Sequence, residues 1–172
     1  MAQELNLKVN HIVAESTNIL STNFGGGHIY SIAIAEDMDN GLLVARAEYA
    51  ANEYEDEVWN AKAYAAGDEA LLLLNPPLLP MTELRGYNTE DKFYNAAGDR
   101  VRAYTLRVGD RITLSEAAFE TAPAAKQFVT FDAASKKYIV GDSKTEGQFC
   151  AQVLTKILRT NMTMYKLQVV SL

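Results

Sequence analysis

Short runs of alternating apolar and polar residues, separated by glycine-containing turns, recur along this chain of 172 residues. In the stretch RAYTLRVGDRITLS, the alternation runs up to Gly109-Asp110 and resumes after it. Side chains on a β-strand point alternately to its two faces, so this pattern predicts strands that are buried on one face. Asn40-Gly41 and further Gly-Asp pairs offer similar turns, because glycine adopts positive φ angles at low cost. The turn pattern therefore favours a mainly antiparallel β fold.

Three β-hairpins are predicted from this punctuation. The first joins the strand in HIYSIAIA to Leu42–Val44 through Asn40-Gly41. The second joins the two alternating runs on either side of Gly109-Asp110. The third lies in FVTFDAASKKYIV, with its turn near residues 133–136. The stretch KTEGQFCAQVLTKILRT is compatible with a helix or a bent strand, and Gly147 and two of its threonines weakly favour the strand. MYKLQVVSL closes the chain as a strand.

The fold class that follows is mainly β, an antiparallel β-barrel or β-sandwich with an extended N-terminal arm. Residues 24–80 and 100–172 form two β-rich halves, as one barrel or two domains, and the loop-rich residues 81–99 connect them. Residues 1–23 lack this pattern and are expected to be an arm that orders only against something else. Its apolar residues have no evident partner in their own domain, which makes them candidate contacts with another protein. These candidates are Leu5, Leu7, Val9, Ile12 and Val13.

Composition argues against several classes of function. The net charge of -6 disfavours broad nucleic-acid binding, which requires clustered Lys and Arg. The single cysteine, Cys150, cannot form an intramolecular disulfide. No apolar run approaches the ~20 residues of a membrane helix, and the first ten residues lack a secretory signal pattern. We therefore expect a protein that is made in a cytoplasm and binds neither nucleic acid nor membrane.

The chain offers few groups for chemistry. Gly25–Gly27 lack the Lys-Ser/Thr ending of a phosphate loop and are expected to be a hinge. Asp37 and Asp39 resemble the start of a calcium loop, but the glycine stands one position early, which favours a turn. Cys150 has apolar neighbours, as inert buried thiols do, although a pair with His28 stays open. The carboxylates of Glu53–Glu57 are typical of a solvated surface, with a hydrolase as the weaker alternative. No catalytic residue, cofactor site or metal site is predicted.

The order of several segments resembles a known family. A glycine run precedes HIYSI, MDNGLLV follows, and GDEALLLLNPP leads to KFYNAAGDRVRAYTLRVGDRITLS. This order is similar to that of small β-rich head proteins of tailed bacteriophages, which decorate or cement the capsid. The resemblance covers most of residues 24–172 and rests on overall pattern and turn placement.

The resemblance implies a non-catalytic virion protein that is made in the host cytoplasm, coats an icosahedral shell and bridges neighbouring subunits. The implied partners are the major capsid protein and further copies of the chain, with a trimer favoured. Nine tyrosines suit a protein interface, because tyrosine combines apolar area with a polar tip. The alternative is an OB-like barrel that binds oligonucleotide or oligosaccharide. It is supported by five arginines in one stretch, namely Arg85, Arg100, Arg102, Arg107 and Arg111.

Overall fold

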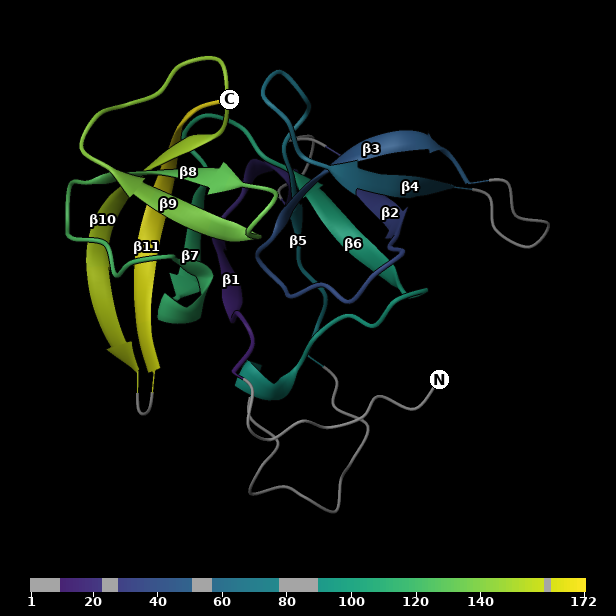
Figure 1. Cartoon of the computed structure of the whole chain (residues 1–172), viewed down its shortest axis with the longest axis horizontal. Helices are drawn as coiled ribbons and strands as arrows, with labels where there is room; N and C mark the ends of the chain where they lie inside the picture. The colour runs from purple at the N-terminus through teal and green to yellow at the C-terminus, as the bar shows by residue number, and fades with distance from the viewer. Residues whose placement is uncertain (1–9, 23–27, 51–56, 78–89, 160–161) are drawn as a thin grey trace.

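The structure is a computed structural model that describes residues 10–22, 28–50, 57–77, 90–159 and 162–172. Over these ranges the chain is mainly β, which confirms the predicted fold class. The strands form two bodies that lie side by side, a closed five-stranded barrel and a six-stranded antiparallel sheet, here called sheet A (Figure 1).

The barrel contains five strands in the order β2-β4-β3-β5-β6, with β6 closing onto β2. Only the β2–β4 pair is parallel. Directly paired residues point to the same face of a sheet, so the registers identify one set of side chains that share a face. Ile32, Val44, Leu71 and Val101 belong to this set and are almost fully buried, so it forms the barrel interior. The strands are β2 (Ile29–Ala33), β3 (Leu43–Tyr49), β4 (Val58–Ala63), β5 (Leu71–Leu73) and β6 (Arg100–Thr105).

Sheet A has the strand order β1-β7-β11-β10-β8-β9, and every pair in it is antiparallel. The N-terminal strand therefore lies at the edge of a sheet made otherwise from the C-terminal part of the chain. The strands are β1 (Ala14–Asn18), β7 (Arg111–Ser115), β8 (Phe128–Asp132), β9 (Lys137–Gly141), β10 (Cys150–Arg159) and β11 (Met162–Ser171). Three short 3-10 helices lie between strands, η1 (Leu20–Thr22), η3 (Glu90–Lys92) and η4 (Glu116–Ala118).

One continuous core joins the two bodies. The outward side chains of β3 and β5, such as Leu43 and Leu72, are as buried as the barrel interior and belong to the same cluster as residues of sheet A. Two buried hydrogen bonds cross this junction. The Tyr138 hydroxyl donates to the Gly41 carbonyl at 2.7 Å, and the Phe149 amide donates to the Tyr64 hydroxyl at 2.7 Å.

Two of the three predicted hairpins are wrong. β2 pairs with β4 and β6 and not with β3, and β6 pairs with β2 and β5 and not with β7. The chain does turn at Gly41 and Gly109, which have positive φ angles. At the second turn, however, the Asp110 carboxylate accepts hydrogen bonds from the Arg107 amide and from the Leu20 amide. This turn therefore carries the chain from the barrel to sheet A instead of joining neighbouring strands.

The third hairpin and the last two strands are confirmed. β8 pairs with β9 from Phe128↔Gly141 to Asp132↔Lys137. The ambiguous segment forms strand β10, which pairs with the closing strand β11 along its whole length. Strand β6, at the start of the predicted second half, pairs with strands of the first half and completes the barrel.

The described part of the N-terminal segment is not a free arm. Ile12, Val13 and Ile19 are buried, at 3%, 5% and 0% exposure. β1 pairs with β7, and the Val13 amide donates to the Ser115 hydroxyl oxygen at 2.9 Å. The expectation that Ile12 and Val13 lack a partner in their own domain is therefore wrong. Their pattern is too short to show periodicity, and their partners follow about 100 residues later in the chain.

Gly41 packs tightly against strands β1 and β7 of sheet A. Its φ angle is +85°, and a Cβ atom built there would lie 2.8 Å from Leu114 Cδ2 and 2.9 Å from Ala14 Cβ. Real Cβ atoms do not approach carbon atoms so closely, so a side chain at this position would push β1 and β7 away from the barrel.

Alanine substitutions at Gly41 and Gly98 form a matched test of this contact. Both glycines have positive φ angles, +85° and +88°, but a Cβ atom at Gly98 meets nothing within 4 Å. We expect Gly98→Ala to lower the free energy of unfolding by about 1–2 kcal/mol through backbone strain alone. Gly41→Ala should cost a further ~1–3 kcal/mol because it overpacks the junction. Urea denaturation measures both values, and equal losses would contradict the close approach.

Candidate functional site

The β10–β11 hairpin extends beyond the rest of sheet A (Figure 1). β11 pairs with β10 over its whole length, whereas β8 pairs only with Cys150–Gln152. Backbone hydrogen bonds to Lys126 and Gln127 cover the same edge as far as Val153. Among the described residues, no strand pairs with the outer edge of β10 beyond that point. A free edge presents unpaired amide and carbonyl groups, which is a common site for adding a further strand.

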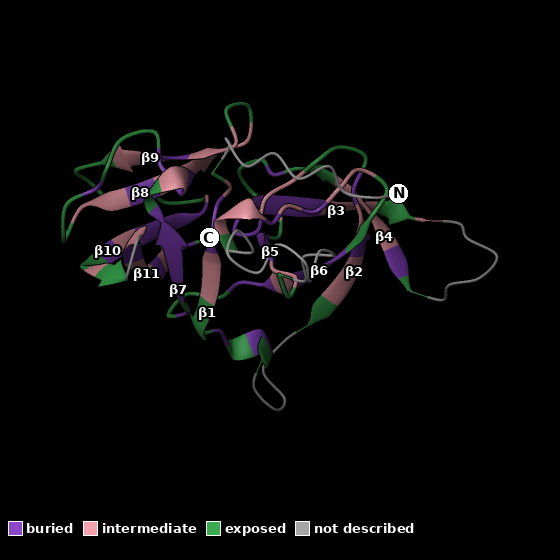
Figure 2. Ribbon diagram, turned by 90° about the horizontal axis from the view of Figure 1, so that it is seen from below, coloured by how far each residue is buried: buried purple, intermediate pink, exposed green. Residues whose placement is uncertain are grey.

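Exposed apolar and basic side chains accompany this free edge. Leu158 is 82% exposed and Leu154 is 37% exposed. Figure 2 shows the end of β10 among the exposed parts of the molecule. Lys156 lies near the Tyr165 ring, and Arg159 forms an ion pair with Glu15 at 2.8 Å. Arg159 follows Leu158 directly and therefore points to the other face of the strand. We call Leu154, Lys156 and Leu158 the hairpin surface.

The start of the described chain lies beside the turn end of the β10–β11 hairpin. A small cavity of about 190 Å³ is lined by Asn10 and His11 on one side and by Met162 and Thr163 of β11 on the other. The ion pair between Arg159 and Glu15 also connects β10 with β1. Of the five candidate contact residues, Leu5, Leu7 and Val9 lie outside the described residues, which begin at Asn10 in this cavity wall.

A histidine–carboxylate pair ties this segment to the barrel. His11 Nδ1 hydrogen bonds with Asp39 Oδ1 at 2.7 Å, and the Ile12 amide donates to Asp39 Oδ2 at 2.9 Å. The His11 ring stacks on Tyr94 with 5.0 Å between centroids. A histidine oriented by an aspartate is half of a nucleophile-activating arrangement. Ser115 lines the same cavity, but its hydroxyl is engaged by the Val13 amide and makes no hydrogen bond with His11. The pair therefore acts as a structural tie.

Large side chains close one mouth of the barrel. Arg46 places its guanidinium carbon 4.3 Å from the Tyr30 ring centroid and 4.9 Å from the Trp59 ring centroid. The same guanidinium reaches Glu69 Oε2 through Nε at 3.1 Å and through Nη2 at 2.9 Å. Tyr49 packs edge-on against Trp59 and is 46% exposed. An arginine held between two aromatic faces and a carboxylate is fixed in position and plugs the mouth.

We expect this plug to contribute to stability. Arg46→Ala removes both ring contacts together with the hydrogen bond and ion pair to Glu69, so the free energy of unfolding should fall by about 1–2 kcal/mol. Arg102→Ala is the control, because the Arg102 side chain is exposed and has no hydrogen bond or ion pair within the described ranges. Thermal and urea unfolding measure the free energy of unfolding of both variants. If Arg46→Ala is no less stable than Arg102→Ala, the plug is only a surface contact.

The remaining sequence candidates do not converge on a chemical site. Asp37 accepts a hydrogen bond from the Ala97 amide at 2.8 Å, and Asp39 binds His11 and the Ile12 amide in the N-terminal segment. Cys150 is fully buried in β10, whereas His28 is exposed before β2, and no hydrogen bond joins them. Gly25–Gly27 and residues 53–56 lie outside the described part. Within that part, no group of three His, Cys, Asp or Glu side chains could hold a metal ion.

Sequence reasoning missed the three arrangements that organise these surfaces: the His11–Asp39 pair, the Arg46 plug and the free edge of β10. Each depends on strand pairing between distant segments. The one available signal was the pattern of VLTKILR, in which two apolar pairs flank Thr155-Lys156, so that some apolar side chains of a strand there must be exposed.

Comparison with known proteins adds no relative to this description. No family model, no curated protein and no solved structure matches the chain. Within the described ranges, no helix has the length and apolar character needed to cross a membrane.

Proposed function

We propose that this protein is a structural virion protein that binds the outside of an icosahedral capsid and bridges neighbouring subunits. The observation that carries the proposal is the hairpin surface, a free strand edge with a leucine that is 82% exposed beside the exit of the N-terminal segment. The resemblance to tailed-phage head proteins supports the same role. The protein would have no catalytic residue and no cofactor.

The hairpin surface has the properties of a contact site. Complete burial of an exposed leucine contributes about 1.5–3 kcal/mol, and a free strand edge adds backbone hydrogen bonds when a partner strand pairs with it. Lys156 gives this edge positive charge, which keeps like edges of free molecules apart, whereas the charge of Arg159 is balanced by Glu15. A partner strand or loop with acidic and apolar side chains fits it best. In this proposal the major capsid protein supplies that partner.

A cement protein acts through several weak contacts at once. The hairpin surface and residues 1–9, which include Leu5, Leu7 and Val9, would provide two contacts from one place on the molecule. Two linked contacts bind more strongly than either alone, because the second forms at a high effective concentration. We further propose that copies associate as trimers on the capsid surface, each interface burying on the order of 1,600 Å².

A second candidate function is a binding module for oligonucleotide or oligosaccharide. The observation that favours it is the aromatic mouth of the barrel, where Tyr49 is 46% exposed beside Trp59 and Arg46. Bases and sugar rings stack on such aromatic faces. Binding of single-stranded DNA or an oligosaccharide that is lost in Tyr49→Ala would favour this function. Binding of DNA should also weaken as salt rises.

The contact role of the hairpin can be tested with a matched pair of substitutions. Leu158→Glu places a charge on the hairpin surface, and Val108→Glu places the same charge on another exposed residue, 64% exposed, at the turn after the barrel. We expect Leu158→Glu to weaken particle binding about tenfold or more, which equals ~1.4 kcal/mol, without changing the fold. Val108→Glu should bind as the unaltered protein does. Co-sedimentation with particles measures both, and equal binding of the two variants would exclude the hairpin surface.

The N-terminal contact requires a deletion that spares the fold. Removing residues 1–20, the deletion that an independent arm would tolerate, would delete β1 together with buried Ile12, Val13 and Ile19, and should unfold sheet A. Removing residues 1–9 leaves these intact. We expect the shorter deletion to keep the melting temperature, weaken particle binding and lower the temperature at which decorated particles rupture. If it protects particles as well as the full chain, residues 1–9 are not a tether. If the full chain neither co-sediments nor protects, the capsid role fails.

A further inference from the structure

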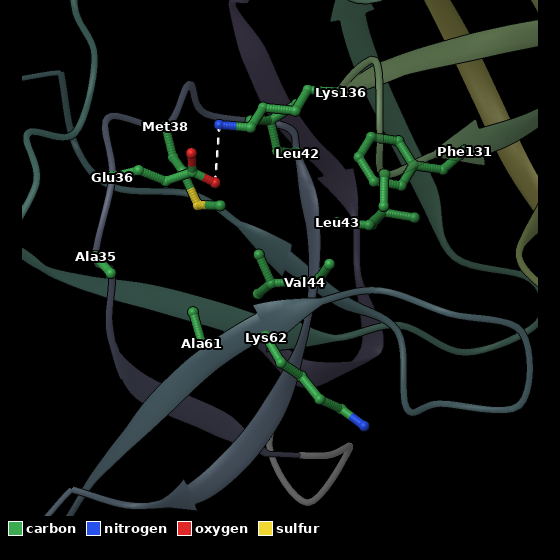
Figure 3. A pocket seen from close by; sticks show the side chains of 12 residues that line it. Ala35, Glu36, Met38, Leu42, Leu43, Val44, Ala61, Lys62, Phe131 and Lys136 are labelled. Atoms are coloured by element: carbon green, nitrogen blue, oxygen red, sulfur yellow. Dashed lines mark ion pairs between the residues drawn. The ribbon is translucent and has the colours of Figure 1, made fainter.

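The second mouth of the barrel opens into an apolar cavity of about 300 Å³ (Figure 3). The cavity lies beyond the end of β2 and the start of β3, whereas the Arg46 plug lies at the opposite ends of these strands. Its floor is the barrel interior at Val44 and Ala61. Phe131 and the β8–β9 turn of sheet A form the facing wall. The volume is at the lower end of the range for small-molecule sites.

Small side chains create this space. Ala35, Ala61, Ala63 and Ala133 line the cavity, at positions where longer side chains would fill it. The interior of a small barrel is normally filled by its own side chains, as the first mouth is by tyrosine, arginine and tryptophan. One mouth is open and the other filled because four alanines from different segments line the open one.

An ion pair spans the entrance. Lys136 Nζ lies 3.0 Å from Glu36 Oε1, and Figure 3 shows these side chains meeting above the apolar walls. The other lining lysine, Lys62, directs its ammonium group away from the cavity (Figure 3), toward Asp68 at 2.8 Å. One cation and one anion thus stand at the opening of an apolar chamber.

The lysine is the better fixed of the two partners. Lys136 has a positive φ angle of 54° in the β8–β9 turn, and its side chain is 35% exposed, against 61% for Glu36. The turn itself is braced by Asp132, which accepts hydrogen bonds from the amides of Ala134 and Ser135 and from the Ser135 hydroxyl. These hydrogen bonds, with the Ser135 hydroxyl first, also lower the pKa of Asp132. An incoming anion can therefore replace the exposed Glu36 carboxylate while Lys136 stays in place.

We propose that this cavity binds a small aliphatic carboxylate. The hydrocarbon chain occupies the space between Val44, Met38 and Phe131, and the carboxylate takes the place of Glu36 on the Lys136 ammonium. A neutral molecule of the same shape gains the apolar contacts without the ion pair. A cationic one meets Lys136 as a like charge. The site discriminates among the three by charge at one end of the ligand.

The occupant would touch both bodies of the fold. Val44 and Ala61 belong to the barrel, whereas Phe131 and Lys136 belong to the β8–β9 hairpin of sheet A. A ligand that binds only the folded state raises its stability in proportion to the logarithm of ligand concentration. The bound carboxylate would thus raise the melting temperature by bracing the junction, a property that does not depend on capsid binding.

Octanoate, octanol and octylamine serve as probes that share one chain and differ in charge. Calorimetric titration of the full chain should give the order octanoate, then octanol, then octylamine, with octanoate about tenfold tighter than octanol. Lys136→Met should remove this preference, so that octanoate binds about tenfold more weakly and octanol is unaffected. Glu36→Gln should tighten octanoate binding several-fold, because it frees the ammonium group. Lys144→Met, which breaks an ion pair with Glu146 away from the cavity, is the control and should change nothing.

Ala61→Leu tests the chamber itself. It should fill the space, abolish binding of octanoate and octanol alike, and leave the chain folded with an unchanged circular dichroism spectrum. Should Ala61→Leu fail to fold, Ala63→Val provides a smaller filling that is expected to weaken both probes. The proposal is overturned if octanoate does not bind at millimolar concentration, if it binds no better than octylamine, or if Lys136→Met and Lys144→Met bind it equally.

Discussion

The buried hydrogen bond from the Tyr138 hydroxyl to the Gly41 carbonyl joins sheet A to the barrel at a glycine that leaves no room for a side chain. Tyr138 is fully buried, and burial raises the pKa of its hydroxyl far above the usual range, so the group stays a neutral donor. A buried carbonyl without a partner costs about 1–3 kcal/mol, so neither group can be lost cheaply. A second buried bond crosses the same junction: the Phe149 amide, just before β10, donates to the Tyr64 hydroxyl, just after β4. These two buried bonds fix the position of sheet A relative to the barrel across their shared apolar core.

The segment of residues 36–41 is a centre of contacts between the barrel, the N-terminal segment and sheet A. Within six residues it contacts the β8–β9 turn through Glu36, the N-terminal segment through Asp39, and sheet A through Gly41. Asn40, 5% exposed, exchanges hydrogen bonds with the backbone of Asn75 at 2.9 and 3.0 Å, which fixes the segment on the barrel. Both proposed sites depend on this centre. The cavity entrance lies at its first residue, Glu36, and its fourth, Asp39, holds His11 and Ile12 near the start of the described chain.

The sequence allowed the class of fold to be predicted, because alternation and turn residues act locally. The β8–β9 hairpin was predictable, since its strands are adjacent and joined by a short turn. The pairing around Gly41 and Gly109 was not, because a glycine with positive φ reverses the chain without deciding which strand lies beside it. The same limit hid the candidate sites. The apparent calcium-loop carboxylate Asp39 is held by His11, 28 residues away, and the edge of β10 is free only because β8 pairs with its first residues.

Native-state hydrogen exchange tests most directly whether the barrel and sheet A form one cooperative unit. The Leu73 amide in the barrel donates to the Leu42 carbonyl at 3.0 Å, and the Val169 amide in sheet A donates to the Asp110 carbonyl at 2.8 Å. If the junction controls the fold, both amides exchange through the same global opening, with equal free energies and equal dependence on denaturant. A lower opening free energy for the Leu73 amide, with the Val169 amide still protected, would show that the barrel unfolds alone and would contradict a single cooperative unit.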